Sequence, residues 1–572
     1  MATSDNPSSP SPRKNPVIGV STSSSPAKAA NAANKPAKPQ PKNNFRETVE
    51  TVVFVVVMVL LLKMFVVEAF VIPTGSMAET LLGYHKIFTC PECGHTFPIN
   101  CSDEVDPQDG NPYPVKDCRC PNCLYEQTFS ASRPSPAYSS GDRVLVHKAM
   151  YHVNSPKRWE IVVFKFPAEP QKKQVPMNYI KRLWGFGGES HAIHRGEVLM
   201  TKALTYPGEP EPDRPEDLWQ PNYYRHNAEE ARHLFEKGRI SGFPEGENGF
   251  ELLRKPDDIM MAERRLVYDN DHQSEMLISK GAPPRWSTDP KRDGGGTFAA
   301  DNTQKPKVFT QSGNKAWIRY QHLTENLWAN PPNAMPAPIR NMMGYNTPHL
   351  PPMKKQDLFD YWCGDLMLEC QAKLTSADSK ITLELSKGEA RYQARIANGT
   401  VTLLRTGDGT EKIIAERPCP VKAAGTYDLR FSNIDCRLRV HVNGKAVEFG
   451  KDADYPLMPV KEYDPLDTGR EGWTLRNDLE APASIGAEGG VEVSHLKIWR
   501  DTVYTAQGLM NRPDHYAEYV DTFYVQPGHY LCLGDNSAQS SDSRDWGTVP
   551  ERLMLGRAVF IFWPFTRIGF IK

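Results

Sequence analysis

The hydrophobic positions divide the chain into one long apolar run and many short ones. Val52 to Ile72 is almost continuously apolar and is interrupted only by Lys63 and Glu68. As a helix rising 1.5 Å per residue, this run reaches about 31 Å, the hydrocarbon thickness of a bilayer. It predicts one transmembrane helix within residues 46–72. A buried core helix is the alternative, but such a helix normally carries a polar stripe.

The segment before the run is polar and basic. Residues 1–45 consist mainly of Ser, Pro, Ala, Asn and Lys, and they cannot bury enough apolar surface to fold. We expect a disordered tail, held in the cytoplasm by the positive-inside rule. Everything after Ile72 then lies outside. Lys63 either extends its ammonium toward the membrane surface or marks a helix partner, and the sequence leaves both open.

The remaining apolar runs are short and read as β-strands. RVLVHK and EIVVFKF are typical of an all-β domain whose strands are separated by Gly and Pro. Residues 262–503 alternate more regularly, with hairpin turn signals at Asn398-Gly399 and Asn443-Gly444. This pattern predicts an antiparallel β-sandwich inserted into another domain, in a protein that is mainly β. His191 and His194 form a short pair that we expect at the surface.

Composition narrows the function classes. The chain of 572 residues carries 68 basic and 69 acidic residues, so no basic excess indicates a nucleic-acid partner. Its 11 Trp, 22 Tyr and 23 Phe exclude a mostly disordered protein. One apolar run near 20 residues excludes a multi-span transporter.

Six of the 11 cysteines fall between Cys90 and Cys123. Cys90, Cys93, Cys120 and Cys123 form two C-P-x-C knuckles, and four thiolates suit a structural Zn²⁺ that has no open position for catalysis. Disulfides remain the alternative, because the predicted location outside the membrane is oxidising. Cys101 and Cys118 could pair with each other, or Cys118 could compete as a ligand.

Three segments carry groups suited to nucleophilic catalysis. Pro73-Thr74-Gly75-Ser76-Met77 follows the apolar run directly. In Tyr179-Ile180-Lys181-Arg182-Leu183, strand alternation places Lys181 on an apolar face, where desolvation lowers the pKa of an amine and makes it a general base. Gly534-Asp-Asn-Ser-Ala-Gln-Ser-Ser-Asp-Ser-Arg544 is a polar loop able to hydrogen-bond around a buried amine.

Together these segments resemble the type I signal peptidases, membrane-anchored serine–lysine proteases with a LexA-like β core. PTGSM matches the nucleophile motif, GDRVLVHK at 141–148 a structural strand, KRLWGFGGE at 181–189 the lysine motif, and GDNSAQSSDSRDWG at 534–547 the last motif. The resemblance implies that Ser76 is the nucleophile and Lys181 its base. It also implies an oxyanion hole formed by the Ser76 N–H and the Thr74 hydroxyl.

Four further positions take supporting roles by the same resemblance. Ser540 would orient the lysine amine, Asp542 and Arg544 would form an ion pair behind it, and Asp535 would support the loop. The implied fold has three core parts, two insertions and an anchor. Their bounds are a tail 1–45, a span 46–72, core parts 73–89, 126–261 (with extended loops) and 504–572, a zinc ribbon 90–125, and a sandwich 262–503 that resembles concanavalin or laminin-G domains.

The resemblance implies a signal peptidase I on the inner (plasma) membrane, with its N-terminus in the cytoplasm and its catalytic domain on the outer face. Its partners are then the signal peptides of exported preproteins and membrane lipid, without a catalytic cofactor. A glycan or protein ligand of the sandwich stays open. The alternatives are a peptidase for a narrow client set and a non-catalytic anchored adaptor. Because all four motifs lie outside 262–503, we expect cleavage to survive deletion of that segment.

Overall fold

The computed structural model describes residues 44–107, 110–167, 177–204, 229–243, 249–289, 296–349, 361–407, 409–422, 424–457, 476–505 and 522–572. The predicted tail, except for its last two residues, lies outside these ranges. The chain divides into two units, residues 1–60 and residues 61–572.

The apolar run forms helix α1 (Asn44–Phe65), which ends earlier than predicted. Val67–Val71 is instead strand β1, paired in antiparallel register with β7 (Arg143–His147). The predicted boundary at Ile72 was therefore wrong, because the VEAFV sequence can alternate its side chains across a sheet and β7 offers its backbone as a partner. Within the described part of the chain, no helix reaches the length and hydropathy that a membrane span requires.

A central antiparallel sheet joins the beginning, middle and end of the second unit. Its strand order is β1-β7-β33-β8-β9-β31-β32, with β34 paired to β33. Alternate residues of these strands, including Val144, Val146, Ile161 and Val163, are buried in one apolar cluster. The remaining bounds are β8 (Ile161–Lys165), β9 (Asn178–Phe186), β31 (His529–Leu533), β32 (Val549–Pro550), β33 (Met554–Trp563) and β34 (Gly569–Phe570).

A smaller sheet has the order β12-β11-β10-β30. It buries His191 and His194 on β10, so the expectation of a surface histidine pair was wrong. β10 pairs on both sides, and Glu189 accepts a hydrogen bond at 3.1 Å from the His191 ring. These elements are β10 (Ser190–His194), β11 (Glu197–Thr201), β12 (Glu251–Leu252), β30 (Thr522–Tyr524) and helix α5 (Glu229–Ser241).

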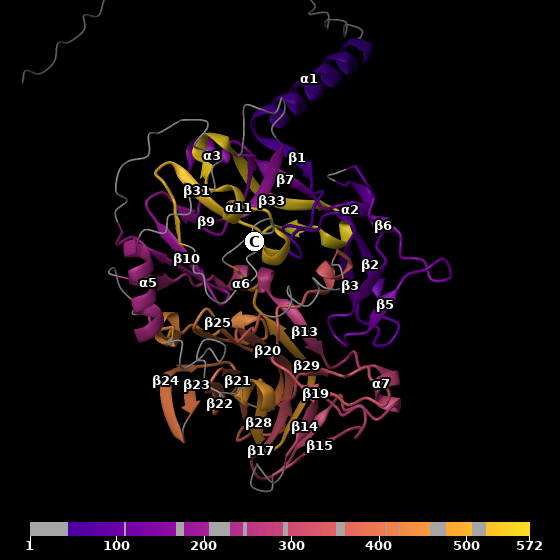
Figure 1. The fold of residues 1–572 in the computed structure, drawn as a ribbon, viewed down its shortest axis with the longest axis vertical. Coiled ribbons are helices and arrows are strands. Elements are labelled where there is room, and N and C mark those ends of the chain that lie inside the picture. The colour runs from indigo at the N-terminus through magenta and orange to yellow at the C-terminus, as the bar shows by residue number, and fades with distance from the viewer. Residues whose placement is uncertain are drawn as a thin grey trace, which may run out of the picture. The chain divides into compact units, whose positions relative to one another are not determined.

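Residues 265–500 contain two antiparallel sheets that share one hydrophobic core. One has the order β15-β16-β29-β20-β25-β26-β27, with β13 also on β29; the other has the order β14-β17-β28-β21-β22-β23-β24. β21, β22, β23 and β24 lie side by side in Figure 1. Both predicted hairpin turns are present, because Asn398-Gly399 and Asn443-Gly444 take the positive φ angles of two-residue turns.

The strands of this two-sheet unit are β13 (Arg265–Asp269), β14 (Trp286–Thr288), β15 (Phe298–Ala300), β16 (Phe309–Gln311), β17 (Ala316–Tyr320), β20 (Leu366–Leu374), β21 (Lys380–Lys387), β22 (Ala390–Ala397), β23 (Thr400–Gly407), β24 (Thr410–Pro418), β25 (Gly425–Ile434), β26 (Arg437–Val442), β27 (Lys445–Ala446), β28 (Ala483–Glu488) and β29 (Val491–Arg500).

The cysteine-rich segment consists of two hairpins. β2 (His85–Thr89) pairs with β3 (Thr96–Asn100) and β6 (Tyr138–Ser139), while β4 (Asp117–Arg119) pairs with β5 (Glu126–Thr128). Short elements complete the described chain. They are α2 (Ser102–Val105), α3 (Met150–Val153), α6 (Asp257–Glu263), α7 (Glu275–Ser279), β18 (Leu323–Glu325), β19 (Met335–Pro336), η2 (Gly344–His349), η3 (Gly450–Ala453), α10 (Arg476–Glu480), η4 (Ser537–Gln539), α11 (Ser543–Trp546), η5 (Glu551–Leu553) and η6 (Phe565–Arg567).

Candidate active site

Ser76 lies half-buried in the turn that follows β1. Met77 and Leu81 anchor this turn in the apolar cluster of the central sheet. The Asn536 backbone N–H donates to the Ser76 carbonyl at 3.0 Å, and its side-chain amide donates to the Gly75 carbonyl at 2.9 Å. The last motif of the sequence therefore holds the backbone of the serine turn directly.

Lys181 on β9 is the side chain next to the serine hydroxyl. Its Nζ donates to Ser76 Oγ at 2.8 Å and to the Ile180 carbonyl at 3.1 Å. The side chain is only 2% exposed, and its ammonium nitrogen lies 5.3 Å from the centre of the Tyr179 ring, on the face that strand alternation predicts. Burial lowers the pKa of Lys181 to about 8, although the nearby Asp542 carboxylate opposes the shift.

Asp542 and Arg544 form a fully buried ion pair behind the lysine. The Arg544 guanidinium donates to both carboxylate oxygens, at 2.8 Å from Nε and 2.6 Å from Nη2. It also donates to Ser537 Oγ at 2.8 Å, which ties η4 to the same loop. Burial raises the pKa of Asp542, but Arg544 and the Ser540 hydroxyl together hold it below its ordinary value. The pair keeps a negative charge close to Lys181.

Ser540 and Thr74 have predicted roles that the described contacts do not test. Ser540 is completely buried, and its hydroxyl helps to lower the pKa of Asp542. The hydrogen bonds described for Lys181 Nζ go to Ser76 Oγ and to the Ile180 carbonyl instead. Thr74 is exposed at the start of the serine turn. Its carbonyl group packs against Gly83 so closely that a Cβ on residue 83 would lie only 2.4 Å from the Thr74 carbonyl carbon. The path of the turn therefore depends on Gly83.

Arg182 is a buried residue next to Lys181 that the sequence analysis did not single out. It is fully buried on β9, with Nε and Nη2 bonded to the two carboxylate oxygens of Asp535 at 2.9 and 2.6 Å. Glu263 of α6 lies 2.9 Å from the same guanidinium, and burial raises the pKa of its carboxyl to about 8. Through these two carboxyl groups, Arg182 ties β9, which carries Lys181, to the segment that follows β31 and leads into Asn536. In the sequence, Arg182 is simply a charged residue next to Lys181 in a strand, and nothing local indicates that Asp535 and Glu263 will be its partners.

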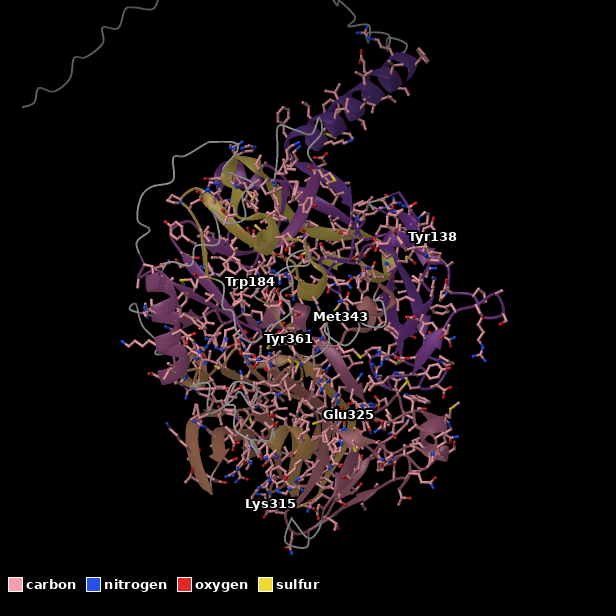
Figure 2. The ribbon with its side chains drawn as sticks, in the orientation of Figure 1. Tyr138, Trp184, Lys315, Glu325, Met343 and Tyr361 are labelled. Atoms are coloured by element: carbon pink, nitrogen blue, oxygen red, sulfur yellow. The ribbon has the colours of Figure 1, made fainter. Side chains whose placement is uncertain are left out.

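Residues 262–503 also reach the serine turn. Arg265 donates to the carbonyls of Ala78 at 2.9 Å and Asp535 at 3.2 Å, and Asn346 of η2 exchanges two hydrogen bonds with Asn536. Tyr345 packs under Gly75, in a cluster with Met343, which is labelled in Figure 2. The expectation that this segment is dispensable rested only on the position of the motifs, and these contacts argue against it.

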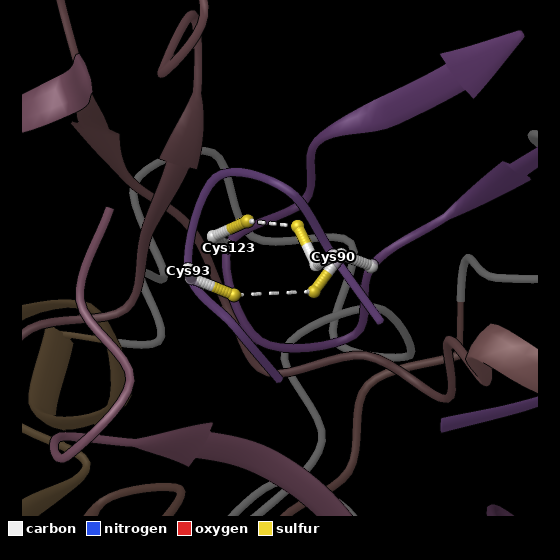
Figure 3. A group of neighbouring side chains, drawn as sticks. Cys90, Cys93 and Cys123 are labelled. Atoms are coloured by element: carbon white, nitrogen blue, oxygen red, sulfur yellow. Dashed lines mark hydrogen bonds between the residues drawn. The ribbon is translucent and has the colours of Figure 1, made fainter. Parts of the chain in front are cut away.

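The four predicted cysteine ligands form a compact buried group. Cys90 Sγ lies 3.6 Å from Cys123 Sγ, and Cys93 Sγ lies 3.6 Å from Cys120 Sγ, with all four sulfurs within 4.8 Å of one another. Figure 3 shows the sulfurs of Cys90, Cys93 and Cys123 turned toward one centre. None of these four cysteines forms a disulfide. A tetrahedron with Zn–S bonds of about 2.3 Å has S···S edges of about 3.8 Å, so the donor set and its spacing fit zinc.

The two knuckles have the same local geometry although their sequences differ. In each knuckle, the residue directly after the second cysteine donates its N–H to the carbonyl of the first cysteine: Gly94 donates to the Cys90 carbonyl and Leu124 to the Cys120 carbonyl, both at 2.9 Å. Gly94 and Leu124 both take positive φ angles, 72° and 62°. Leucine rarely adopts this conformation. The positive φ angle of Leu124, at the position that matches Gly94, therefore gives both knuckles the same turn, in which two thiols point inward.

Comparison with known proteins identifies the peptidase segments. A family model described as "Signal peptidase, peptidase S26" matches residues 127–237 and 436–563. The chain is related to the S26 signal peptidases. The matched ranges contain Lys181 and the 534–547 loop, while Ser76 precedes them. The match supports the predicted enzyme class, a serine endopeptidase, whose chemistry requires no cofactor.

The similarity to individual curated relatives is local. The chain is 30% identical to thylakoidal processing peptidase 1 of Arabidopsis thaliana over 94 residues, 16% of this chain and 27% of that protein. It is 52% identical to signal peptidase I of Streptococcus pneumoniae (strain ATCC BAA-255 / R6) over 48 residues, 8% of this chain and 24% of that protein. The aligned part of this chain thus spans about a quarter of the length of each of these curated relatives.

Among solved structures, a carbohydrate binding module, CBM66 from Bacillus subtilis, covers 38% of the chain and 93% of its own length. It shares 12% identity at a TM-score of 0.19, which is too low to establish a common fold.

Proposed function

We propose that this protein is a serine–lysine endopeptidase that cleaves signal peptides from exported preproteins. The observation that carries the proposal is the 2.8 Å contact between the buried Lys181 amine and Ser76 Oγ. A lysine with a pKa near 8 is partly neutral at physiological pH and can accept a proton. A degenerate, non-catalytic adaptor would have no reason to keep this pair intact.

The mechanism follows from these two groups. Neutral Lys181 takes the proton of Ser76 Oγ as the oxygen attacks the scissile carbonyl, which forms an acyl-enzyme and releases the amine of the mature protein. The protonated lysine supplies the proton to the leaving amine, and a water attacks the acyl group in the second step. The N–H of Ser76 and the hydroxyl of Thr74 are our proposed donors to the oxyanion.

Mapping a cleavage site tests the proposal. Purified full-length protein is incubated with a preprotein, and the new N-terminus is located by mass spectrometry. We expect one cut, after small side chains at the end of the signal peptide, and no cut with the Ser76→Ala variant. Uncleaved preproteins of several kinds, with the protein folded, would contradict the proposed activity.

The pH dependence of cleavage follows from the lowered pKa of Lys181. Only the neutral amine accepts the serine proton, so kcat/KM should rise about tenfold per pH unit below pH 8 and level off above it. Activity at pH 6 should be about 100-fold below the plateau. The measurement is initial cleavage rate at low substrate concentration from pH 6 to pH 10. A flat profile, or one that falls through this range, would contradict a neutral lysine base.

We also propose that Cys90, Cys93, Cys120 and Cys123 bind a structural zinc ion. All four positions are filled by protein thiolates, so the metal closes the two hairpins on each other and takes no part in bond cleavage. Elemental analysis of the purified protein should give about one zinc per chain.

Cysteine variants separate this zinc site from nearby thiols. The double variant Cys93→Ser/Cys123→Ser should lose the metal, because it removes one ligand from each knuckle. Cys101→Ser is the matched control, since Cys101 is buried in the same cluster but lies outside the tetrad. Zinc retained by the double variant, or absent from a wild-type protein with free thiols, would contradict the site.

The inner-membrane location stays a prediction. It rests on the apolar run of the sequence, with the basic tail before it, and it assigns the catalytic core to the outer face. Two of the matched proteins are named mitochondrial inner membrane protease subunit 1, from Mus musculus and Homo sapiens, and the mouse protein is 45% identical over 49 residues, 9% of this chain and 30% of that protein. Membrane lipid and any ligand of the two-sheet unit likewise remain proposals.

A further inference from the structure

Asn346 and Asn536 form a reciprocal amide pair beside the serine turn. Asn346 Nδ2 donates to Asn536 Oδ1 at 2.7 Å, and Asn536 Nδ2 donates to Asn346 Oδ1 at 2.8 Å. Both side chains are 2% exposed. Asn536 uses its second amide hydrogen for the Gly75 carbonyl and its backbone N–H for the Ser76 carbonyl. Asn536 therefore makes two bonds to the serine turn, and the one to the Gly75 carbonyl depends on the orientation of its side-chain amide.

The segment that carries Asn346 is fixed to the cysteine-rich hairpins. In η2, Gly344 lies so close to Phe97 and Pro121 that a Cβ there would stand 3.0 and 2.9 Å from their side chains. The Arg119 N–H donates to Thr347 Oγ1 at 3.0 Å. Between these two anchors, Tyr345 is fully buried with its ring against Gly75. η2 is thus held on one side, and on the other it presents Tyr345 to the serine turn and Asn346 to Asn536.

From this geometry we infer that Asn346 is a positioning residue: through Asn536, the inserted region sets the backbone of the turn that carries Ser76. This inference rests on the proposed function for its catalytic consequence, but the ordering of the turn does not depend on it. Truncating Asn346 leaves the Asn536 carbonyl oxygen without its donor in a buried site, so the Asn536 amide is free to turn. The Gly75 carbonyl then loses its partner, and Ser76 Oγ shifts relative to Lys181.

Hydrogen exchange of the full-length protein tests the ordering directly. Asn346→Ala should raise the exchange rate of amides in residues 73–82, measured by mass spectrometry on peptides, by about tenfold or more. Asn270→Ala is the matched control, because Asn270 is also a 2% exposed asparagine of the inserted region but donates to the Pro306 carbonyl. Unchanged exchange in 73–82, or an equal increase with Asn270→Ala, overturns the inference.

Cleavage kinetics test the route through Asn536. Asn346→Ala should lower kcat about 10- to 100-fold while KM changes less than about twofold, because the reacting atoms are misplaced and the substrate surface is not. The double variant Asn346→Ala/Asn536→Ala should be no slower than Asn536→Ala alone. Losses that multiply would overturn the route. If Asn346→Ala exchanges faster in residues 73–82 but the wild-type protein cleaves no preprotein, the proposed function is refuted and the positioning role stands.

Discussion

Ser76→Ala and Lys181→Ala should each lower kcat/KM for preprotein cleavage by about 10⁴-fold or more, and the double variant should be no worse than either single one. Ser76→Ala removes the attacking atom, and Lys181→Ala leaves that atom without the base that lies 2.8 Å away. Lys181→Arg should fail as completely, because a guanidinium stays protonated and cannot accept a proton. Quantitative cleavage of a synthetic signal-peptide substrate provides the measurement.

Two control variants separate loss of chemistry from loss of structure. Ser432→Ala removes another buried hydroxyl, on β25, and Lys380→Ala removes a surface lysine of β21. Both should cleave within about twofold of wild type, since surface and remote changes rarely alter a site. Circular dichroism and thermal unfolding confirm that each variant folds. If folded Ser76→Ala or Lys181→Ala keeps more than about 1% of wild-type activity, the assignment of the dyad is wrong.

Excising residues 262–503 should lower kcat/KM at least about 10²-fold. The two ends of this segment are adjacent, because Arg265 pairs with Arg500 across β13 and β29, so a short linker can replace it. The excision removes Glu263 from Arg182, Arg265 from two carbonyls of the site, and the η2 contacts with the serine turn. Activity is measured on a substrate short enough to need no contact with the inserted region.

Point variants show whether these contacts cause the loss. Arg265→Ala/Tyr345→Ala/Asn346→Ala keeps the two sheets and removes only side chains that touch the site. We expect it to reproduce most of the loss caused by excision. An excised protein that folds and retains wild-type kcat/KM would contradict the structural coupling and restore the view that the insertion is dispensable.

The sequence alone indicated the candidate catalytic groups because their signals are local. Ser76, Lys181 and the Asp542–Arg544 pair lie in short motifs that resemble those of the type I signal peptidases, and strand alternation was enough to put Lys181 on the apolar face. The cysteine knuckles were equally readable, since spacing within each knuckle fixes two thiols side by side. The mainly β character and the two Asn-Gly turns followed from periodicity and turn chemistry.

Tertiary structure decided what depends on distant partners. The helix ends at Phe65 because β7, more than 70 positions further on, pairs with Val67–Val71. Asn346 meets Asn536 across 190 positions, and Arg182 meets Asp535 across 353. A lone Asn or Arg carries no local sign of such a partner, because a buried polar group is satisfied by whichever donor or acceptor the fold brings to it. The sequence thus indicated which side chains are candidates for catalysis, and only the fold determined which residues hold them in place.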